Sequence, residues 1–525
     1  RPTPERAHMS NQPVPDTFEA ELDALFAQQV TAGLAKALVY GRVSDSGLGH
    51  VAGFGAANDD GLLPDADTLF PIASITKSFV ACAALIARDR GALSLDDPIT
   101  AYVPEFTASG SMDDPCDPPT LGMLLSMSGG LTEDNSWVDP FIDSSEHELL
   151  AQVGHGLRYS HLPGTTFEYS NLGFTLAGLA VGRAVGRPIE SFVKDEVFEP
   201  LGMTSTFFDN AAPTGVERAT GYQLDATTTW TPYPYTASAA FAAAGGIMST
   251  VRDLATWITW LGSAFRKPEP GGDTILSRPS RREMQRIHIV GSPAIAKRTT
   301  NALNAVIGGY GLGLGISLDL HHGTLVSHGG GLPGFLLYVL WHPDSGHGLV
   351  VLTNSHRGNL PDLCGQAIGQ VLTRDSAAAQ TVVLWPETMQ LRGAAEQLIR
   401  EWDDELAAQI FAPNVDFDRS LTERRAEIDE LLEQVGPLAG PPPRVDIVSA
   451  ATAADVAWAI PCERGQLLCM IHLTPVSPAR IQEFTVRAVP AGVPRSAAPT
   501  DLSPRRANLG EAFISPSANV RVVTP

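Results

Sequence analysis

The segment Ser74-Ile75-Thr76-Lys77 carries residue types that nucleophilic chemistry needs. A helical pattern begins here and continues to Gly91, so Ser74 and Lys77 are expected on one face of a helix. A serine hydroxyl needs a base within hydrogen-bond reach, and a lysine amine becomes such a base when burial lowers its pKa. The first turn of a helix also favours negative charge that develops on a substrate. The spacing is therefore compatible with nucleophilic catalysis by Ser74.

The same spacing occurs again at Ser191 and Lys194, where we interpret it as a helix turn on the surface. A lone Ser-x-x-Lys pattern is more often a coincidence than a catalytic pair. The hypothesis therefore depends on two further segments that follow Ser74 in the chain.

The first of these segments is Tyr169-Ser170-Asn171, which precedes an apolar helix. A tyrosine hydroxyl near Lys77 can relay a proton between a nucleophile and a leaving group. The Asn171 amide can donate to a substrate carbonyl and to the surroundings of Lys77. Without the other motifs, a buried tyrosine with a satisfied hydroxyl would be the commoner explanation.

The second segment is His328-Gly329-Gly330-Gly331, at the end of an apolar strand. Glycines at such a position let a substrate backbone approach an edge strand closely. A glycine triplet alone more often marks a flexible junction between a strand and a turn, so its meaning depends on its place after Ser74 and Tyr169.

In this order the three segments resemble the penicillin-recognising serine hydrolases, which include class C β-lactamases, D-aminopeptidases, DD-peptidases and β-lactamase-fold esterases. The middle motif has its Tyr-x-Asn form, and the third motif has His328 in place of lysine. The resemblance covers about residues 17–372. Three further stretches are similar to this group: Pro163–Asn171, Glu199–Met203 and Gly245–Thr250.

The resemblance implies a role for each matching side chain. Ser74 would be the acyl-enzyme nucleophile, and Lys77 would accept its proton. Tyr169 would be the general acid and base of acylation and deacylation. Asn171 would hold the substrate amide.

The resemblance also implies how a substrate would be held. The backbone N–H groups of Ser74 and Gly331 would form the oxyanion hole, and Gly329 and Gly330 would border the substrate. Loss of one oxyanion donor typically costs about 3 kcal/mol of barrier. Neither a metal ion nor an organic cofactor is implied, and the expected partner is a small-molecule or short-peptide substrate.

His328 is the departure from the β-lactamase pattern. Lysine would supply a fixed positive charge for a substrate carboxylate, whereas a histidine with a pKa near 6.5 is mostly neutral at pH 7. In the similar proteins, the His-x-Gly form is typical of D-aminopeptidases, esterases and peptide-processing acyl-transferases. We therefore expect a serine hydrolase that cleaves an ester or amide bond, with weak β-lactam hydrolysis. An acyl-transferase or peptide cyclase, a weak β-lactamase or DD-peptidase, and a non-catalytic binding protein stay open as alternatives.

The composition is ordinary for a globular protein, with 525 residues, 44% hydrophobic and 18% charged. The formal net charge of -22 argues against nucleic acid or an anionic membrane as a partner. No stretch of about 20 apolar residues is present, so no membrane span is expected. Residues 1–10 lack an apolar segment and are interpreted as an added tag. We expect a cytoplasmic protein unless a signal peptide has been removed, and we leave self-association into a homo-oligomer open.

The remaining sequence predicts the elements that hold these motifs. An α+β fold is expected, with an antiparallel β-sheet flanked by helices plus a helical subdomain, as in the β-lactamase-like fold. Leu131 to about Pro163 is interpreted equally well as a wall of a substrate cleft or as part of the helical subdomain. The expected elements of the sheet region are Thr17–Ala35, Ala37–Val43, Leu48–Phe54, Gly323–His328, Phe335–Trp341, Gly348–Thr353 and Leu360–Leu372.

Four parts are expected along the chain. Residues 1–16 are a tag or disordered N-terminus, and residues 17–380 form the serine hydrolase domain. Residues 381–490 form a small C-terminal α+β domain, and residues 491–525 are a tail rich in Pro, Ser and Ala. In the C-terminal domain, we expect helices at Met389–Ala412 and Ser420–Val435, followed by four strands.

The histidines and cysteines of the chain do not have the spacing of metal ligands. His321, His322 and His356 have no carboxylate or cysteine partner at suitable spacing, so we interpret them as surface histidines of a hairpin and expect no metal site. The chain has five cysteines without metal spacing, which fits a reducing compartment. Pairing of Cys462 with Cys469 across a hairpin is the alternative.

Overall fold

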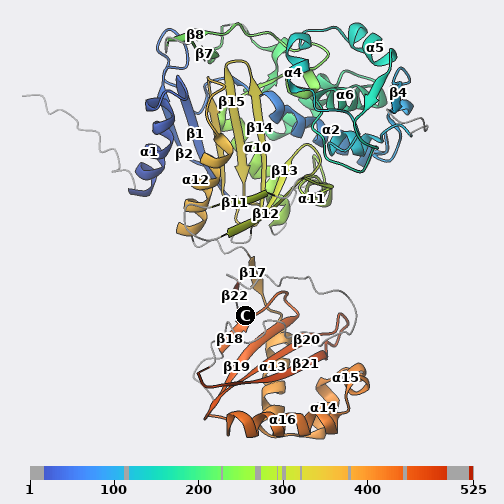
Figure 1. Cartoon of the computed structure of the whole chain (residues 1–525), viewed down its shortest axis with the longest axis vertical. Helices are drawn as coiled ribbons and strands as arrows, with labels where there is room; N and C mark the ends of the chain where they lie inside the picture. The colour runs from blue at the N-terminus through green and yellow to red at the C-terminus, as the bar shows by residue number, and fades with distance from the viewer. Residues whose placement is uncertain are drawn as a thin grey trace, which may run out of the picture. The chain divides into compact units, whose positions relative to one another are not determined.

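The computed structural model describes residues 17–110, 117–213, 215–225, 229–266, 274–291, 294–297, 303–319, 322–375, 380–440, 446–492 and 520–523. The chain divides into two compact units, Arg1–Ala377 and Ala378–Pro525 (Figure 1). The boundary expected from the sequence, at residue 380, lies close to this division. The expected N-terminal segment and most of the expected tail lie outside the described residues.

A nine-stranded antiparallel sheet forms the centre of the first unit. Its strand order is β10-β12-β13-β14-β15-β16-β1-β2, and β11 also pairs with β12. The strands are β1 (Ala37–Ser44), β2 (Gly47–Gly55), β10 (Ile289–Val290), β11 (Ala294–Lys297), β12 (Leu303–Tyr310), β13 (Gly315–Asp319), β14 (Gly323–Leu332), β15 (Phe335–Trp341) and β16 (Gly348–Thr353). Because Tyr40 of β1 lies opposite Val351 of β16, segments from the two ends of the unit meet inside the sheet. The predicted antiparallel sheet is confirmed.

Helices bury both faces of this sheet, since successive side chains of a strand point to opposite faces. Leu38 and Tyr40 pack with the helices α1 (Thr17–Thr31) and α12 (Leu360–Arg374), which lie on one side of the strands (Figure 1). Val39 belongs to the core on the other face, together with residues of α10 (Val251–Gly262). The sheet is thus packed on both faces, and its strands are held in place by helices on either side.

The predicted helical subdomain lies between β2 and β10 in the sequence. Its helices are α2 (Thr76–Asp89), α3 (Leu121–Leu125), α4 (Asn135–Val138), α5 (Glu146–Gly154), α6 (Asn171–Val185), α7 (Ile189–Val193), α8 (Glu199–Leu201), α9 (Ala242–Gly245) and α11 (Arg278–Met284). Short strands pair within it: β3 (Phe70–Pro71) and β6 (Phe207–Phe208) with β9 (Ile247–Ser249), β4 (Ala108–Gly110) with β5 (Leu157–Tyr159), and β7 (Tyr222–Leu224) with β8 (Trp230–Pro232). The predicted combination of a sheet with a helical insertion is confirmed.

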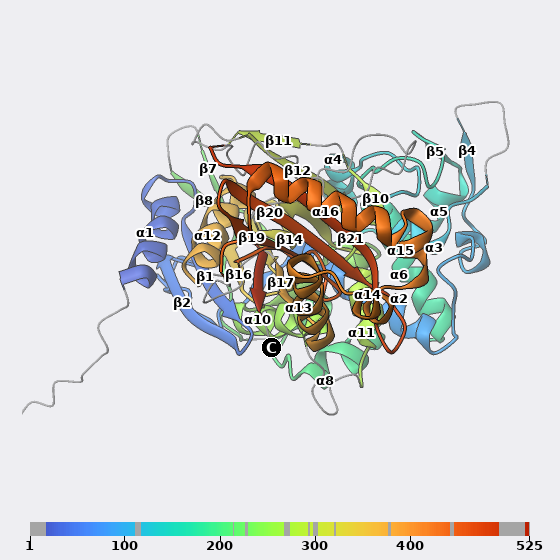
Figure 2. The ribbon, with the colours of Figure 1, turned by 90° about the horizontal axis from the view of Figure 1, so that it is seen from below.

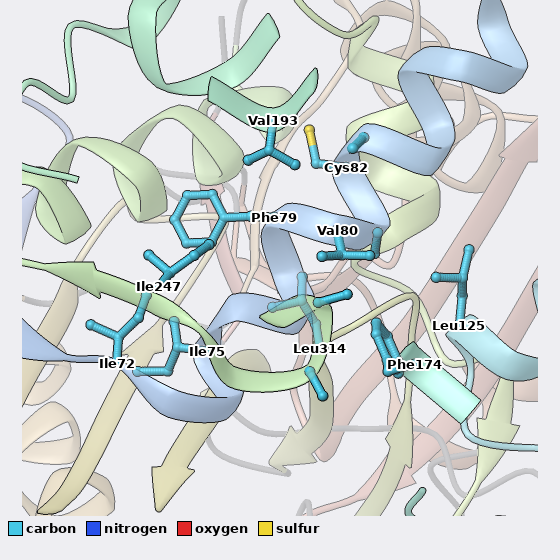
Figure 3. Close-up of a cluster of buried hydrophobic side chains, with 14 of the residues drawn as sticks. Ile72, Ile75, Phe79, Val80, Cys82, Leu125, Phe174, Val193, Ile247 and Leu314 are labelled. Carbon is cyan, nitrogen blue, oxygen red and sulfur yellow. The ribbon is translucent and has the colours of Figure 1, made fainter. Parts of the chain in front are cut away.

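Helix α2, which follows Ser74, is buried on all sides. Every residue from Thr76 to Ala87 is buried. Figure 3 shows why: Phe79, Val80 and Cys82 point away from the helix in different directions, toward apolar residues of other segments. A helix that is apolar all round is stable only inside a large core. The turn that carries Ser74 is therefore anchored in the hydrophobic core of the unit.

The second unit contains a four-stranded antiparallel sheet with helices on one face. Its elements are α13 (Pro386–Arg400), α14 (Asp404–Ile410), α15 (Pro413–Asp418), α16 (Leu421–Val435), β18 (Asp446–Ser449), β19 (Asp455–Cys462), β20 (Gly465–Leu473) and β21 (Ile481–Pro490). A parallel pair joins β17 (Gln380–Val383) to β22 (Val520–Val523). Figure 2 shows α13, α14 and α16 in front of the strands of this sheet, where their apolar side chains form the core of the unit.

Two details of the second unit correct the sequence analysis. The single helix expected at Met389–Ala412 is wrong, because the Asp403 side chain accepts hydrogen bonds from the N–H groups of Glu405 and Leu406 and so starts a new helix. Cys462 and Cys469 are free thiols. The strand register places Cys469 opposite Trp458 rather than opposite Cys462, so the suggested pairing is also wrong.

Within the described part of the chain, every helix is either too short or too polar to cross a lipid bilayer.

Candidate active site

Ser74 lies in a turn with a strained backbone. The 3-10 turn of residues 73–75 runs directly into α2. Ala73 has a φ of 48°, in the left-handed region that is unfavourable for residues with a Cβ atom. Ile72 anchors the turn, because its N–H donates to the Ile247 carbonyl at 2.8 Å and its side chain lies in the core near Ile247 (Figure 3). The packing of the surrounding residues holds the strained turn, and with it Ser74, in place.

Lys77 lies one helical turn after Ser74, and its side chain is fully buried. Its Nζ lies 3.0 Å from Ser74 Oγ, 2.7 Å from Asn171 Oδ1 and 2.8 Å from the carbonyl oxygen of Ala244. A neutral amine has two N–H groups and one lone pair. Because Asn171 Oδ1 and the Ala244 carbonyl can only accept, the lone pair of neutral Lys77 is left for the Ser74 hydroxyl proton. This arrangement suits a general base.

The protonation state of Lys77 also suits a base. Burial lowers the pKa of Lys77 from 10.5 to about 7, and the negative charge of Asp134 partly offsets that fall. Near neutral pH a large fraction of the amine is therefore unprotonated. An exposed lysine at the ordinary pKa would offer almost none.

Tyr169 completes the group around Ser74. Burial raises the pKa of the Tyr169 phenol, and a hydrogen bond with Ser74 partly offsets this rise. The Tyr169 ring centroid lies 5.0 Å from Lys77 Nζ. The phenol therefore keeps its proton at neutral pH and can donate it. The structure brings Ser74, Lys77 and Tyr169 together, as the sequence predicted.

Asn171 is in contact with the same group, but its amide is already used by the protein. Its Oδ1 faces Lys77 Nζ, and its Nδ2 donates to Asp134 Oδ1 at 3.0 Å and to Asn135 Oδ1 at 2.9 Å. No N–H of the Asn171 side chain is left for a substrate carbonyl. The structure thus places the Asn171 amide oxygen against Lys77, and the substrate-holding role that the resemblance implies stays a prediction.

Sequence reasoning missed Asp134 and the Ala244 carbonyl. Asp134 is buried directly before α4, and its carboxylate contacts the N-terminus of α6. An acidic residue in a polar loop is too common a pattern to be singled out. A backbone carbonyl such as that of Ala244 has no signature in the sequence, because any residue type can supply it.

His328 lies on β14 and is buried with the hydroxyl of Tyr310, which sequence reasoning also missed. His328 Nδ1 lies 2.6 Å from the Gly329 carbonyl oxygen, which can only accept, so Nδ1 carries the proton. Nε2 then accepts from the Tyr310 hydroxyl at 2.8 Å. Burial, together with the charge of Lys77, lowers the pKa of His328 to about 3. The histidine therefore stays neutral at every pH near 7, more strictly than its ordinary pKa would predict.

The three glycines after His328 lie on β14 beside the Ser74 turn, and all three line the same cavity. A Cβ atom on Gly330 would lie 2.4 Å from the Ile72 carbonyl oxygen, so only glycine lets the strand approach the turn this closely. A Cβ atom on Gly331 would meet nothing within 4 Å. Glycine is thus needed at position 330 for close packing against the turn. At position 331, the space that a side chain would fill is open.

A cavity of about 790 Å³ opens in front of Ser74. Its apolar lining consists mainly of Val138, Ile142, Phe241, Leu332, Pro333, Phe335 and Leu336, and its polar lining includes Asn135, Ser136, Gln223, Tyr233 and His356. Among the described residues that line it, none is Asp, Glu, Lys or Arg. The cavity therefore suits a substrate without formal charge.

Two open questions from the sequence are settled by this cavity. In the region Leu131–Pro163, α4 and Ile142 line the cavity, as expected for a cleft wall. Helix α5 belongs to the helical subdomain, as the other interpretation expects. Each interpretation is therefore correct for one portion of the region. His356 is exposed, but it follows β16 in a loop and lines the cavity, so its placement on a hairpin is wrong. His321 lies outside the described residues. In the described ranges, no three His, Cys, Asp or Glu side chains are grouped so that they could hold a metal ion.

Comparison with known families and curated proteins gives three similarities. A family model described as Beta-lactamase matches residues 18–371. Protein flp of Staphylococcus aureus (strain NCTC 8325 / PS 47) is 27% identical over 303 residues, which are 56% of this chain and 55% of that protein. Esterase EstB of Burkholderia gladioli is 34% identical over 160 residues, which are 28% of this chain and 40% of that protein. The chain thus spans about half the length, or less, of these curated relatives.

Solved structures give the same fold at low sequence identity. The octameric penicillin-binding protein homologue from Pyrococcus abyssi matches with a TM-score of 0.59 and 18% identity, over 89% of this chain and 99% of that chain. D-alanine carboxypeptidase AmpC from Burkholderia cenocepacia matches with a TM-score of 0.53 and 19% identity, over 68% of this chain and 99% of that chain. At such identities these matches show the fold alone.

Proposed function

Because this chain belongs to the beta-lactamase family, whose model matches residues 18–371, we propose that it is a serine hydrolase that cleaves an uncharged ester or amide through an acyl-enzyme on Ser74. One observation carries the proposal: Lys77 Nζ lies 3.0 Å from Ser74 Oγ, and its two other partners leave only its lone pair for the serine. A lysine with a pKa of about 7 is an effective base near neutral pH.

In acylation, Ser74 Oγ bonds to the substrate carbonyl carbon while its proton passes to Lys77 Nζ. The backbone N–H groups of Ser74 and Gly331 are the proposed donors to the negative carbonyl oxygen. The bond from the carbonyl carbon to the leaving oxygen or nitrogen then breaks. The leaving group takes a proton from Tyr169, which recovers one from Lys77.

In deacylation, a water molecule attacks the acyl carbon and gives a proton to Tyr169, which passes one on to Lys77. The bond to Ser74 Oγ breaks, and Ser74 regains a proton as the acid product leaves. Asn171 and the Ala244 carbonyl hold the Lys77 amine in the same orientation in both halves of the reaction. No cofactor takes part in this scheme.

The neutral lining of the cavity supports an uncharged substrate. His328 stays neutral because burial lowers its pKa to about 3, so it offers no fixed charge to a substrate carboxylate. Apolar surface of the cavity comes from Val138, Ile142, Phe241, Leu332 and Leu336. The ester hydrolysis named for EstB agrees with such a substrate. A free carboxylate would find no Lys or Arg side chain among the described residues that line this cavity.

A substrate panel tests the proposal. The full chain and its Ser74→Ala variant are assayed with p-nitrophenyl butyrate, with the p-nitrophenyl monoester of succinate, and with nitrocefin. We expect kcat/KM for the butyrate to exceed that for the succinate ester and for nitrocefin by at least about tenfold, since an unpaired buried charge is strongly unfavourable. Nitrocefin or the succinate ester as the better substrate would reverse the assignment.

Product analysis separates hydrolysis from acyl transfer. An added primary amine competes with water for the acyl-enzyme, and hydrolysis predicts the free acid as the main product even at millimolar amine. Amide as the main product would favour the acyl-transferase alternative. Complete absence of Ser74-dependent turnover and of covalent labelling by a fluorophosphonate would leave a binding protein as the remaining interpretation.

A further inference from the structure

Asp134 is a buried carboxylate that contacts the catalytic group without lining the cavity. Its side chain is only 7% exposed. Oδ1 accepts from the backbone N–H of Asn171 at 2.7 Å and from Asn171 Nδ2 at 3.0 Å. Oδ2 accepts from the Leu172 N–H at 2.8 Å and from Ser170 Oγ at 3.0 Å. Four donors therefore satisfy the whole acceptor capacity of the carboxylate.

These contacts place a negative charge at the N-terminus of α6. The first N–H groups of a helix have no partner within the helix, and the helix dipole favours an anion there. Ser170 caps α6 locally by accepting from the Gly173 N–H, and its hydroxyl proton goes to Asp134. The local cap alone leaves the N–H groups of Asn171 and Leu172 unpaired, and Asp134 supplies their acceptor from a different segment.

We propose that Asp134 is a positioning residue of the reaction: it fixes both the backbone and the side chain of Asn171, so that the amide oxygen faces Lys77 Nζ. The geometry supports this directly, because Asn171 Nδ2 donates to Asp134 while Asn171 Oδ1 lies 2.7 Å from the lysine. With the amide turned around, its N–H groups would face the Lys77 N–H groups, and the lysine lone pair would be diverted from Ser74. The inference rests on the proposed function for its kinetic consequences.

Asp134 also acts on Lys77 through charge. The polar groups that face the lysine amine are Ser74, Asn171 and the Ala244 carbonyl, with the Tyr169 ring close by. Of the ionisable groups farther away, Asp134 favours the protonated amine, whereas His328 is neutral near pH 7 because burial and the charge of Lys77 lower its pKa. Removal of the Asp134 charge is therefore expected to lower the pH at which Lys77 loses its proton.

Asp134→Asn separates this role from a merely structural one. The new amide would direct N–H groups at the donors of α6, and the charge near Lys77 would be lost. We expect kcat for p-nitrophenyl butyrate to fall about 10- to 100-fold and the acidic limb of the kcat/KM profile to move to lower pH by about one unit. A purely structural residue would reduce the amount of folded protein without moving the profile.

Glu133→Gln is the matched control, because it makes the same charge change at the neighbouring, exposed residue. Glu133 accepts from the Asn135 N–H and contacts neither Asn171 nor α6, and glutamine can still accept that bond. We expect activity within about twofold of wild type and an unmoved pH profile. A profile that moves equally in both variants would overturn the positioning role, since the effect would then be one of general surface charge.

Asp134→Glu covers the case in which Asp134→Asn does not fold. This variant keeps the charge but moves it by about one methylene group, so kcat should fall while the profile stays near its wild-type position. Wild-type kcat in folded Asp134→Glu would overturn the positioning claim. Circular dichroism establishes folding of each variant.

A measurement that does not depend on activity can test this inference separately from the proposed function. The chain has five lysines, so the titration of Lys77 can be followed by NMR in protein labelled on the lysine side chains. We expect the Lys77 midpoint to be lower in Asp134→Asn than in wild type and unchanged in Glu133→Gln. If wild type shows no Ser74-dependent hydrolysis, the proposed function fails, yet this titration still decides whether Asp134 acts on Lys77. An identical Lys77 midpoint in all three proteins would overturn the inference.

Discussion

Two helix turns of this chain, at Ser74 and at Ser191, carry a serine and a lysine at the same spacing. Lys77 in the first turn is fully buried, and burial lowers its pKa to about 7. Lys194 in the second turn is exposed, and its Nζ lies 2.9 Å from Glu199 Oε1, whose hydrogen bond raises its pKa. The same spacing therefore gives a buried, partly neutral amine in one turn and a surface cation in the other.

The difference comes from what the neighbouring segments supply. Lys77 meets Asn171 and Ala244, which lie far away in the sequence, whereas Lys194 meets Glu199 from the following turn. Helical spacing decides which side chains share a face, but the exclusion of water decides the protonation state. A Ser-x-x-Lys turn thus offers a neutral amine near pH 7 only where other elements bury the lysine and surround it with hydrogen-bond acceptors.

The largest difference between the two turns is expected in the activity that remains when each serine is replaced by alanine. We expect Ser74→Ala to lower kcat/KM for p-nitrophenyl butyrate by a factor on the order of 10⁴, because it removes the proposed nucleophile. Ser191→Ala should retain wild-type activity. Intact mass after fluorophosphonate treatment should show one label on wild type and on Ser191→Ala, but none on Ser74→Ala. A label on Ser74→Ala would contradict the proposal that Ser74 is the nucleophile and Ser191 is not.

The two lysines should differ in the pH dependence of activity. Because only neutral Lys77 can accept the serine proton, kcat/KM of wild type should rise with pH, pass its midpoint near 7 and then level off. Lys77→Met should lower kcat/KM by a factor on the order of 10³, whereas Lys194→Met should keep both the rate and the profile. Initial rates between pH 5 and 9 check this. A flat wild-type profile would contradict a buried base.

The same proton affects stability. The folded-state pKa of Lys77, about 7, lies below the ordinary 10.5, so between these values the unfolded chain binds a proton that the folded chain does not. The free energy of unfolding should therefore rise with pH in this window, by up to about 1.4 kcal/mol per pH unit, and this gain is lost as the pH falls through 7. Urea unfolding of wild type, Lys77→Met and Lys194→Met at pH 7 and 9 should show this term missing only from Lys77→Met.

The smallest effect is expected at the residue before each serine. Ala73 has a left-handed φ of 48°, whereas Glu190 lies within α7. Ala73→Gly should relieve strain of roughly 1–2 kcal/mol, partly offset by the greater freedom of glycine in the unfolded chain, for a net gain below about 1 kcal/mol. Glu190→Gly should instead lower stability by about 0.5–1 kcal/mol. Denaturant midpoints show whether each substitution raises or lowers the free energy of unfolding. A loss of stability in Ala73→Gly would contradict the claim that the Ala73 backbone is strained.

Several features could be predicted from local patterns. The antiparallel sheet follows from alternating apolar residues and the turn after Trp341, and the helix after Ser74 follows from its continuous apolar run. The break within the helix predicted at Met389–Ala412 cannot be read from the apolar pattern, because it depends on the Asp403 side chain acting as an N-cap in a polar sequence. Boundaries of this kind depend on one hydrogen-bonding side chain rather than on a periodic pattern.

The sequence by itself determined which segments carry chemistry: a serine and lysine one turn apart, a Tyr-x-Asn segment and a strand with three glycines. Only the tertiary structure decided what these groups can do. It buried Lys77 and not Lys194, made His328 a neutral partner of Tyr310, and paired the Asn171 amide with Asp134 and Lys77. The physical reason is that residue type fixes which bonds a group can make, whereas desolvation and available partners, supplied by distant segments, fix its charge and orientation.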